Sequence, residues 1–252
     1  MQITEIFPAL QGEAVHSGRP CVFVRVGGCN LRCPGFGYTE VHKGKEYIGC
    51  DSIFSVHTDF KQSFWDEVKD WREMVRFIDK HIKESYEKQD IIFTGGEPLI
   101  YHTTDVMVNT IKHFISNGYQ VWFETNGTLD IDFQKYPIYK KCHFVISPKL
   151  ESSGEKLEVR CKPMIIDNIV SNTEESVLKF VVDPNNIEWK LELFDDYLIN
   201  IPTLVPVYLM PMGGTKTELE SNAGAVYKLC EELGFRYSDR LHIRMYDDKK
   251  GV

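Results

Sequence analysis

Seven short runs of apolar and β-branched residues recur along the chain, and their spacing constrains the fold more than any other feature. They lie at Cys21–Val26, Asp90–Thr94, Tyr119–Thr125, Cys142–Ser147, Val177–Val182, Leu204–Met210 and Arg240–Met245. Most are apolar almost without interruption, as strands are when a parallel sheet is covered on both faces. We therefore expect each run to form a strand of a parallel sheet.

Segments with helical periodicity lie between these runs. Apolar side chains in Trp65–Tyr86 follow three- and four-residue spacing, which predicts one amphipathic helix. Thr103–Asn117 carries a second apolar stripe, and Thr217–Gly234 predicts a third helix that ends on a C-cap glycine. Strands that alternate with helices indicate an α/β fold. No repeat or linker interrupts the pattern, so we expect a single domain over residues 1–252.

Composition narrows the class of protein. The chain has 252 residues, 42% of them hydrophobic, which is ample for one sizeable core. Its net charge of −8 disfavours direct binding to nucleic acid, because proteins that grip a phosphate backbone are usually basic. No apolar run approaches the roughly 18 residues that span a bilayer, and the N-terminus lacks a signal-peptide pattern, so we expect no membrane association and a cytoplasmic location.

Polar and glycine-rich segments follow five of the expected strands. They are GGCN after Cys21–Val26, GGEP after Asp90–Thr94, NGT after Tyr119–Thr125, PK after Cys142–Ser147 and PMGG after Leu204–Met210. In barrel-like and open parallel sheets, ligands bind at the C-terminal ends of the strands. We therefore expect these five segments to line a common ligand-binding mouth.

Three of the seven cysteines lie close together in the sequence, at Cys29, Cys33 and Cys50. Three thiolates suit a [4Fe–4S] cluster that keeps one iron free for a small chelating molecule. Two alternatives stay open at this point: the three are buried apolar side chains, or they form a zinc site with His42 or His57 as the fourth ligand. The other four cysteines lie in apolar stretches and are expected to carry no chemistry.

The chain resembles the radical S-adenosylmethionine (SAM) superfamily and, within it, the 7-carboxy-7-deazaguanine synthase family. The resemblance covers nearly the whole chain. It is carried by these segments: FPALQGE (Phe7–Glu13), GRPCVFVRVGGCNLRC (Gly18–Cys33), GCDS (Gly49–Ser52), TGGEP (Thr94–Pro98), FETNGT (Phe123–Thr128), SPK (Ser147–Lys149), LMPMGG (Leu209–Gly214) and the terminal RLHIRMYDDKKGV. TGGEP alone would indicate only the superfamily, whereas the ordered set indicates the family.

The resemblance implies a partial, open (β/α) barrel with fewer than eight β/α units. It also implies an enzyme that converts 6-carboxy-5,6,7,8-tetrahydropterin to 7-carboxy-7-deazaguanine with loss of ammonia, using a [4Fe–4S] cluster, SAM and Mg²⁺. The superfamily pattern is C-x3-C-x2-C, and here the second interval is enlarged by an inserted cluster loop at residues 34–49. The triplet Cys50-Asp51-Ser52 matches the family after the insertion, which makes Cys50 the third ligand.

The same resemblance implies roles for individual residues. The cluster ligands are Cys29, Cys33 and Cys50, and the hydroxyl of Ser52 ligates Mg²⁺. The residues expected to bind SAM are Gly49, Asp51, Gly95, Gly96, Glu97, Glu124, Ser147, Pro148, Lys149, Met210, Pro211, Met212 and Gly213. The residues expected to bind the substrate are Leu10, Gln11, Gly12, Glu13, Arg25, Thr94 and Val252. No side chain is expected to be catalytic, because the cluster and SAM carry the chemistry.

The resemblance further implies a homodimer and an electron donor such as flavodoxin or ferredoxin. Within the inserted loop, KGKE could turn a short hairpin, and we hypothesise that the loop shields the cluster or substrate side of the mouth. Two other functions remain to be separated from this one. The first is another radical SAM enzyme, such as a glycyl-radical activating enzyme, and the second is a zinc-stabilised binding protein without catalysis.

Overall fold

A computed structural model describes residues 1–84, 86–186 and 188–249. Its main sheet has nine strands in the order β11-β10-β9-β8-β7-β6-β2-β1-β5. The strands that run parallel to one another are β2 (Pro20–Val26), β6 (Asp90–Gly95), β7 (Val121–Thr125), β8 (His143–Ile146), β9 (Glu175–Val182), β10 (Val207–Pro211) and β11 (Arg236–Tyr237). β1 (Gln2–Leu10) and β5 (Asp66–Glu67) pair antiparallel at one edge.

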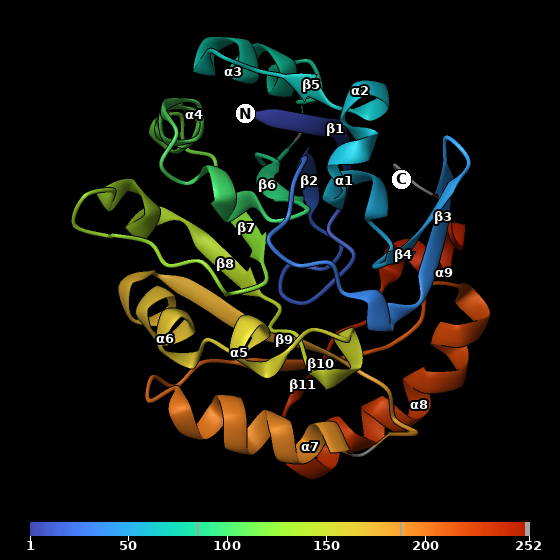
Figure 1. The fold of residues 1–252 in the computed structure, drawn as a ribbon. Coiled ribbons are helices and arrows are strands. Elements are labelled where there is room, and N and C mark those ends of the chain that lie inside the picture. The colour runs from blue at the N-terminus through green and yellow to red at the C-terminus, as the bar shows by residue number, and fades with distance from the viewer. Residues whose placement is uncertain (85, 187, 250–252) are drawn as a thin grey trace.

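The sheet curves into part of a barrel, with helices outside it (Figure 1). Its order begins at β11 and ends at β5, so within the described residues it stays open, as expected for a partial barrel. The helices are α1 (Ile53–Val56), α2 (Lys61–Phe64), α3 (Trp71–Asp79), α4 (Asp105–Ser116), α5 (Leu157–Arg160), α6 (Pro163–Asn172), α7 (Glu188–Glu192), α8 (Lys216–Leu233) and α9 (Leu241–Tyr246). None of the described helices is both long and apolar enough to span a membrane.

Short turns of tighter or wider helix complete the described structure. The 3-10 turns are η1 (Pro34–Phe36), η2 (Thr58–Phe60), η3 (Pro98–Tyr101), η4 (Pro137–Lys141), η5 (Glu151–Ser153) and η7 (Leu198–Asn200), and η6 (Leu193–Tyr197) is a π-helical turn. Three of them, η1, η3 and η5, lie in the connections that follow β2, β6 and β8.

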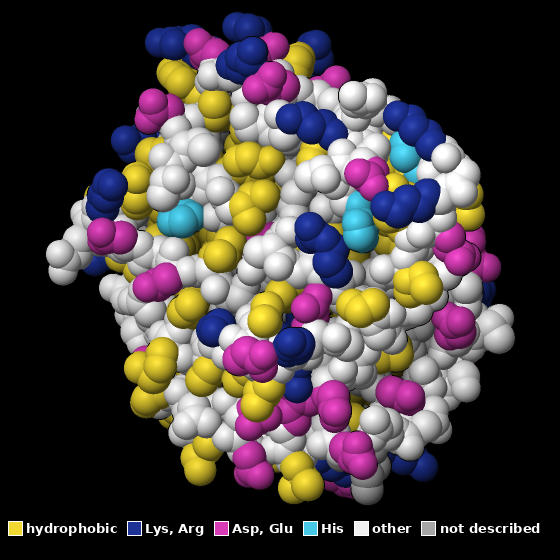
Figure 2. Space-filling view, in the orientation of Figure 1, with side chains coloured by type: hydrophobic (Ala, Val, Ile, Leu, Met, Phe, Trp, Pro, Cys, Tyr) yellow, Lys and Arg dark blue, Asp and Glu magenta, His cyan; other side chains and the backbone are white. Residues whose placement is uncertain are grey.

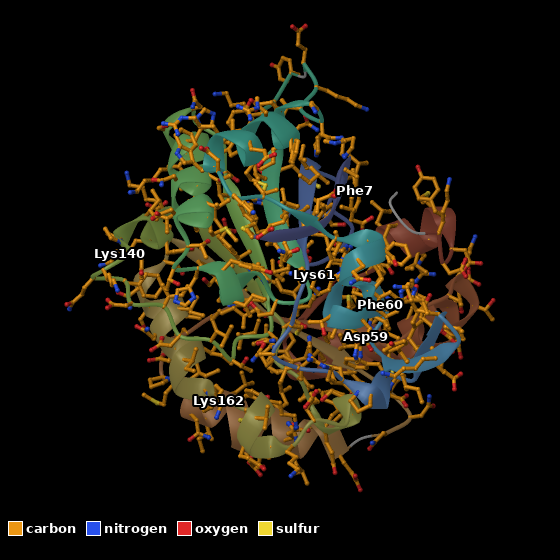
Figure 3. The ribbon with its side chains drawn as sticks, turned by 45° about the horizontal axis from the view of Figure 1, so that its top comes forward. Phe7, Asp59, Phe60, Lys61, Lys140 and Lys162 are labelled. Carbon is orange, nitrogen blue, oxygen red and sulfur yellow. The ribbon has the colours of Figure 1, made fainter. Side chains whose placement is uncertain are left out.

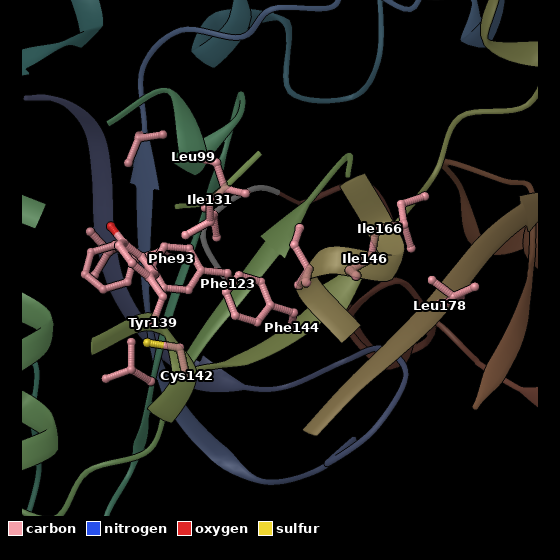
Figure 4. Packing of buried hydrophobic residues seen from close by; sticks show 14 of the residues in the cluster. Phe93, Leu99, Phe123, Ile131, Tyr139, Cys142, Phe144, Ile146, Ile166 and Leu178 are labelled. Atoms are coloured by element: carbon pink, nitrogen blue, oxygen red, sulfur yellow. The ribbon is translucent and has the colours of Figure 1, made fainter. Parts of the chain in front are cut away.

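The alternation of side chains along each strand separates two apolar layers. On the outer face, Phe93, Phe123 and Phe144 stack in a row, with 5.3 Å between successive ring centroids, under the surrounding helices (Figure 4). Each fully buried phenylalanine contributes about 1.5–3 kcal/mol of transfer free energy. On the inner face, a smaller cluster contains Cys21, Ile92, Trp122, Val145, Val177 and Tyr208. The near-continuous apolar character of the strands therefore follows from burial on both faces.

The inner face turns polar toward the C-terminal ends of the strands. Two residues after Ile92, Trp122, Val145 and Val177, the same face presents Thr94, Glu124, Ser147 and Lys179, respectively. A strand's period of two brings these side chains to the same side of the sheet as the apolar cluster. The fold thus positions a polar layer at the mouth of the partial barrel.

The run Arg240–Met245 was expected to be a strand, and that prediction is wrong. Residues Leu241–Tyr246 form helix α9, and the edge of the sheet is instead β11. The helix buries only Ile243, while Arg240 and Arg244 lie four residues apart and bind Asp51 and Asp239, respectively. Apolar residues at every second position in so short a run could not distinguish a strand from a helix whose arginines are held by carboxylates.

The expected helix over Trp65–Tyr86 is also wrong at its start and end. Residues Asp66–Glu67 pair with β1 as β5, and Val68 donates its backbone N–H to the carbonyl of Met1 at 2.8 Å. Asp70 then caps α3 by accepting from the amide of Arg72. By contrast, α4 and α8 confirm the helices expected over Thr103–Asn117 and Thr217–Gly234.

The inserted segment contains the expected hairpin, formed by β3 (Tyr38–His42) and β4 (Lys45–Gly49). Lys43 and Gly44 connect the strands with positive φ angles of 50° and 77°, the pattern of a type I′ turn. Tyr47 packs on Phe60 and donates its hydroxyl to Asp59 at 2.6 Å, which joins the hairpin to η2. Asp59 and Phe60 are labelled in Figure 3. Lysine and histidine side chains gather over this part of the surface (Figure 2).

Candidate functional site

The three cysteines predicted to hold a cluster come from two connections. Cys29 and Cys33 follow β2, and Cys50 follows β4. Burial raises the pKa of Cys29 to about 12, and the charges of Cys33 and Cys50 add to that rise. Burial also raises the pKa of Cys50 to about 12, with a further contribution from Cys33. Cys29 is influenced by both other thiols and Cys50 by Cys33, which indicates that the three predicted ligands lie near one another.

Within the described residues, the three thiols are not grouped as the ligands of a single metal ion. Tetrahedral ligands of one Zn²⁺ lie about 3.8 Å apart at metal–sulfur distances of about 2.3 Å, and no three His, Cys, Asp or Glu of the described ranges are arranged to hold one metal ion. The proposed fourth zinc ligands serve elsewhere, since His42 stacks on Phe60 at 4.5 Å and His57 lies edge-on to Tyr47. A [4Fe–4S] cube instead binds each thiolate through a different iron, so its sulfur ligands lie further apart.

Glycines allow the connections after β2 and β6 to touch backbone to backbone. A side-chain carbon on Gly96 would lie 2.0 Å from the carbonyl oxygen of Gly28. The amide of Glu97 donates to that carbonyl at 2.8 Å. Gly95 and Gly96, both predicted to bind SAM, are thereby fixed beside the segment that leads into Cys29.

Glu97 connects the segment after β6 to the C-terminal end of β7. Its carboxylate is fully buried and accepts from the amide of Leu99 at 3.0 Å, the hydroxyl of Thr125 at 2.7 Å and the amide of Asn126 at 2.7 Å. Burial raises its pKa, although these donors favour the ionised form. The carboxylate therefore already has three partners within the protein, and its predicted contact with the SAM ammonium stays a prediction.

A second polar chain ties the cysteine loop to the connection after β7. Asn30 donates to the hydroxyl of Thr128 at 2.7 Å, and Asn126 donates to the side-chain oxygen of Asn30 at 3.0 Å. Sequence reasoning singled out these segments but assigned Asn30 and Asn126 no role. Their hydrogen bonds orient the loop that carries Cys29.

The polar layer inside the barrel contains several predicted substrate contacts. Glu124 accepts from Thr94 at 2.7 Å and from Gln11 at 3.2 Å. Arg25 donates to Glu5 at 2.6 Å and to the hydroxyl of Ser52 at 3.3 Å. The structure thus links Ser52, the predicted Mg²⁺ ligand, to the predicted substrate-binding arginine.

A charged centre lies beside this layer. Glu13 accepts from Lys179 and, at 3.0 Å, from Arg240, and Arg240 also donates to Asp51 at 2.8 Å. Burial opposes the ionisation of Glu13, but the charges of Lys179 and Arg240 outweigh it and hold its pKa below the usual range. Arg240 has the same net effect on the pKa of Asp51.

Lys179 and Arg240 were not identified from the sequence. The signal for Lys179 was its position as a lone charge in an apolar strand, two residues after Val177. The role of Arg240 depends on contacts across 227 residues, so no local pattern could reveal it.

The remaining predicted residues differ in how closely they join the site. Lys149 donates to the carbonyl and hydroxyl of Ser147, and Pro148 between them is buried. Met210 and Pro211 end β10, Met212 donates its amide to Val182, and the carbonyl of Gly213 accepts from Arg240. Gly12 packs against His242, and Gly49 packs against the carbonyl of Arg32. Leu10 ends β1, 53% exposed, and Val252 lies outside the described residues.

The chain is similar to a protein family with an iron–sulfur cluster and to several enzymes that share one name. A family described as "4Fe-4S single cluster domain" matches residues 10–164. The 7-carboxy-7-deazaguanine synthase of Halobacterium salinarum is 32% identical over 98% of this chain and 91% of its own length. The enzyme of the same name from Rickettsia prowazekii is 28% identical over 96% and 86%, respectively.

Two solved structures share the fold. The crystal structure of QueE from Escherichia coli superposes with a TM-score of 0.59 at 21% identity, over 96% of this chain and 94% of that one. Streptococcus suis SuiB, bound to precursor peptide SuiA, superposes with a TM-score of 0.53 at 12% identity, over 88% of this chain and 49% of that one.

Proposed function

The chain belongs to the 7-carboxy-7-deazaguanine synthase family of radical SAM enzymes, and from this membership we propose that it converts 6-carboxy-5,6,7,8-tetrahydropterin to 7-carboxy-7-deazaguanine with loss of ammonia. It is a lyase of 7-deazaguanine biosynthesis that uses a [4Fe–4S] cluster and SAM. When bound, these two groups supply the one-electron chemistry that abstracts a hydrogen atom from the pterin. The observation that carries the assignment is the trio of buried Cys33 and half-buried Cys29 and Cys50, near one another at the mouth of the partial barrel.

The three thiols are the proposed ligands of the cluster. Their raised pKa values mean that each is protonated at neutral pH without iron, so cluster binding must release protons. Protonated thiols carry no charge, so the three cysteines do not repel one another in the apoprotein. Cluster uptake should therefore become more favourable as pH rises.

The proposed SAM site follows the mouth of the sheet. Gly95 and Gly96 present backbone close to Cys29, and Glu97 fixes that connection against β7. The other residues proposed for this site are Gly49, Asp51, Glu124, Ser147, Pro148, Lys149, Met210, Pro211, Met212 and Gly213. Met210 carries a thioether rather than a strong hydrogen-bonding group, so its contact with SAM is proposed to be apolar.

The proposed pterin site is the polar layer inside the barrel. The guanidinium of Arg25 is a planar fork suited to the substrate carboxylate, and it is close to Ser52 through a 3.3 Å hydrogen bond. The hydroxyl of Ser52 is a hard oxygen ligand of the kind that Mg²⁺ prefers, and it donates at 3.2 Å to Asp51, which is proposed for the SAM site. The other residues proposed to contact substrate are Leu10, Gln11, Gly12, Glu13, Thr94 and Val252.

Several properties of the enzyme in the cell are proposed on the same basis. All seven cysteines are free, which fits a reducing cytoplasm. A single-electron donor such as flavodoxin or ferredoxin is proposed to reduce the cluster. One sheet joins residue 2 to residue 237, which supports a single domain. A homodimer and a shielding role for residues 34–49 complete the proposal.

Anaerobic incubation of the reduced protein with SAM, Mg²⁺ and the carboxytetrahydropterin tests this function. We expect 7-carboxy-7-deazaguanine to form. SAM is either converted to 5′-deoxyadenosine, one molecule per product, or regenerated in each turnover. Deoxyadenosine without the deazaguanine would assign a different radical SAM reaction, and a colourless protein with one zinc and no sulfide would refute both.

A further inference from the structure

Cys33 adopts a backbone conformation that is unusual for its residue type. Its φ and ψ angles are 50° and 52°, in the left-handed region that side chains other than glycine rarely occupy. Such a conformation persists only where the surroundings determine it, and it often marks a functional site. The question is which group holds it in place.

A single carboxylate oxygen lies at the centre of this turn. Oε1 of Glu155 accepts from the amide of Cys33 at 2.8 Å and from the amide of Arg32 at 2.5 Å. Successive amides that converge when the backbone passes through the left-handed region form an anion-binding concavity, or nest. Here the nest is filled by the protein's own anion, 122 residues further along the chain.

Glu155 is itself held by several contacts. The buried guanidinium of Arg160 donates to the carbonyl of Glu155 at 3.0 Å and forms an ion pair with Glu192. The neighbouring turns η1 and η5 touch so closely that a side-chain carbon on Gly35 would lie 2.3 Å from the carbonyl oxygen of Ser152. These contacts fix the position of the segment after β8 that carries Glu155.

We propose that Glu155 is a positioning residue for the cluster: by filling the nest at Arg32 and Cys33, it holds Cys33 in the left-handed conformation and aims its thiolate at an iron. This inference rests on the proposed role of Cys33 as a ligand. A carboxylate that accepts from the amide of the coordinating cysteine also places a negative charge beside the cluster. That charge disfavours the added electron and lowers the reduction potential.

Three variants separate the geometric effect from the charge effect. Glu155→Ala removes both the acceptor and the charge, Glu155→Gln keeps an acceptor oxygen and removes the charge, and Glu158→Ala removes an exposed carboxylate of the same segment as a matched control. The holoproteins are compared by release of iron to a chelator, by a redox titration followed by electron paramagnetic resonance, and by thermal melting. Cys33→Ala is measured in parallel.

We expect Glu155→Ala to release iron at least about 10-fold faster than wild type, the usual range for the loss of an outer partner of a metal ligand. We expect Glu155→Gln to retain its iron and to shift the midpoint potential to more positive values. Rates and potentials equal to those of Glu158→Ala would overturn the proposal. A Cys33→Ala protein with a full, unaltered cluster would instead refute the ligand assignment under "Proposed function".

Discussion

Replacement of Glu13 by alanine tests how the charged centre of the barrel is held together. The side chains of Glu13, Lys179 and Arg240 are 13%, 8% and 13% exposed, so the three charges are almost fully withdrawn from water. Loss of the carboxylate leaves Lys179 as a buried cation without its direct partner. Arg240 is less affected, because Asp51 and the carbonyl of Gly213 still accept from it.

The expected loss of stability follows from that uneven compensation. Breaking a buried ion pair by removing one partner costs about 3–5 kcal/mol. The charge of Glu124 also acts on Lys179 and offsets part of the loss, so we expect a value near the lower end, about 3 kcal/mol. At about 2–4 °C per kcal/mol for a chain of this size, the melting temperature should fall by roughly 6–12 °C.

Thermal melting and urea unfolding of the apoprotein measure the effect. The matched control is Lys69→Ala, which removes an exposed partner from the Lys69–Glu67 pair and should cost less than about 1 kcal/mol. In the double variant Glu13→Gln/Lys179→Met both charges are gone, and most of the stability should return. If Glu13→Ala costs no more than Lys69→Ala, the reasoning about this buried centre is refuted.

The pH dependence of stability should show the same carboxylate. Because the folded pKa of Glu13 lies below its ordinary value of 4.5, its contribution is present above pH 4.5 and lost as the pH falls toward the folded pKa. Wild type should therefore lose stability more steeply than Glu13→Gln below pH 4.5, and parallel curves would contradict this. Gly96→Ala should disrupt cluster uptake, since its new carbon would lie 2.0 Å from the carbonyl of Gly28, and unchanged iron content would count against the packing described. Glu97→Ala should lower stability by about 3 kcal/mol or more, because three buried donors lose their acceptor; a melting curve like that of wild type would show that they find other partners.

The sequence predicted the parallel strands β2 and β6 to β10 well because most of their residues are buried on both faces, whereas the exposed and half-buried pair that forms β11 was not expected. The apolar runs Cys21–Val26 and Val177–Val182 indicate strands without knowledge of their neighbours in the sheet, and both lie within observed strands. β1 was not expected, since most of its residues are only half-buried at the antiparallel edge and its pattern is mixed. Arg240–Met245 failed for a related reason: Arg240 at its start is held by Asp51, which is distant in the sequence, and its helix buries only Ile243.

The candidate site contains residues that local motifs reveal and residues that only tertiary contacts reveal. Cys29, Gly96 and Glu97 occur in local motifs whose backbone requirements are visible in the sequence. Lys179 and Glu155 act through partners 166 and 122 residues away, so only the folded chain shows what they hold. Local patterns therefore predict the groups proposed to meet the cofactors, while the groups proposed to position them emerged from tertiary contacts.

Iron and acid-labile sulfide analysis of Cys50→Ala beside wild type tests the central claim most directly, with Cys161→Ala as a control outside the trio. We expect wild type and Cys161→Ala to hold about four iron and four sulfide ions per chain, the content of a [4Fe–4S] cluster. Cys50→Ala should lose most of both. A Cys50→Ala protein that keeps the wild-type content would contradict the assignment of the three thiols across the inserted hairpin.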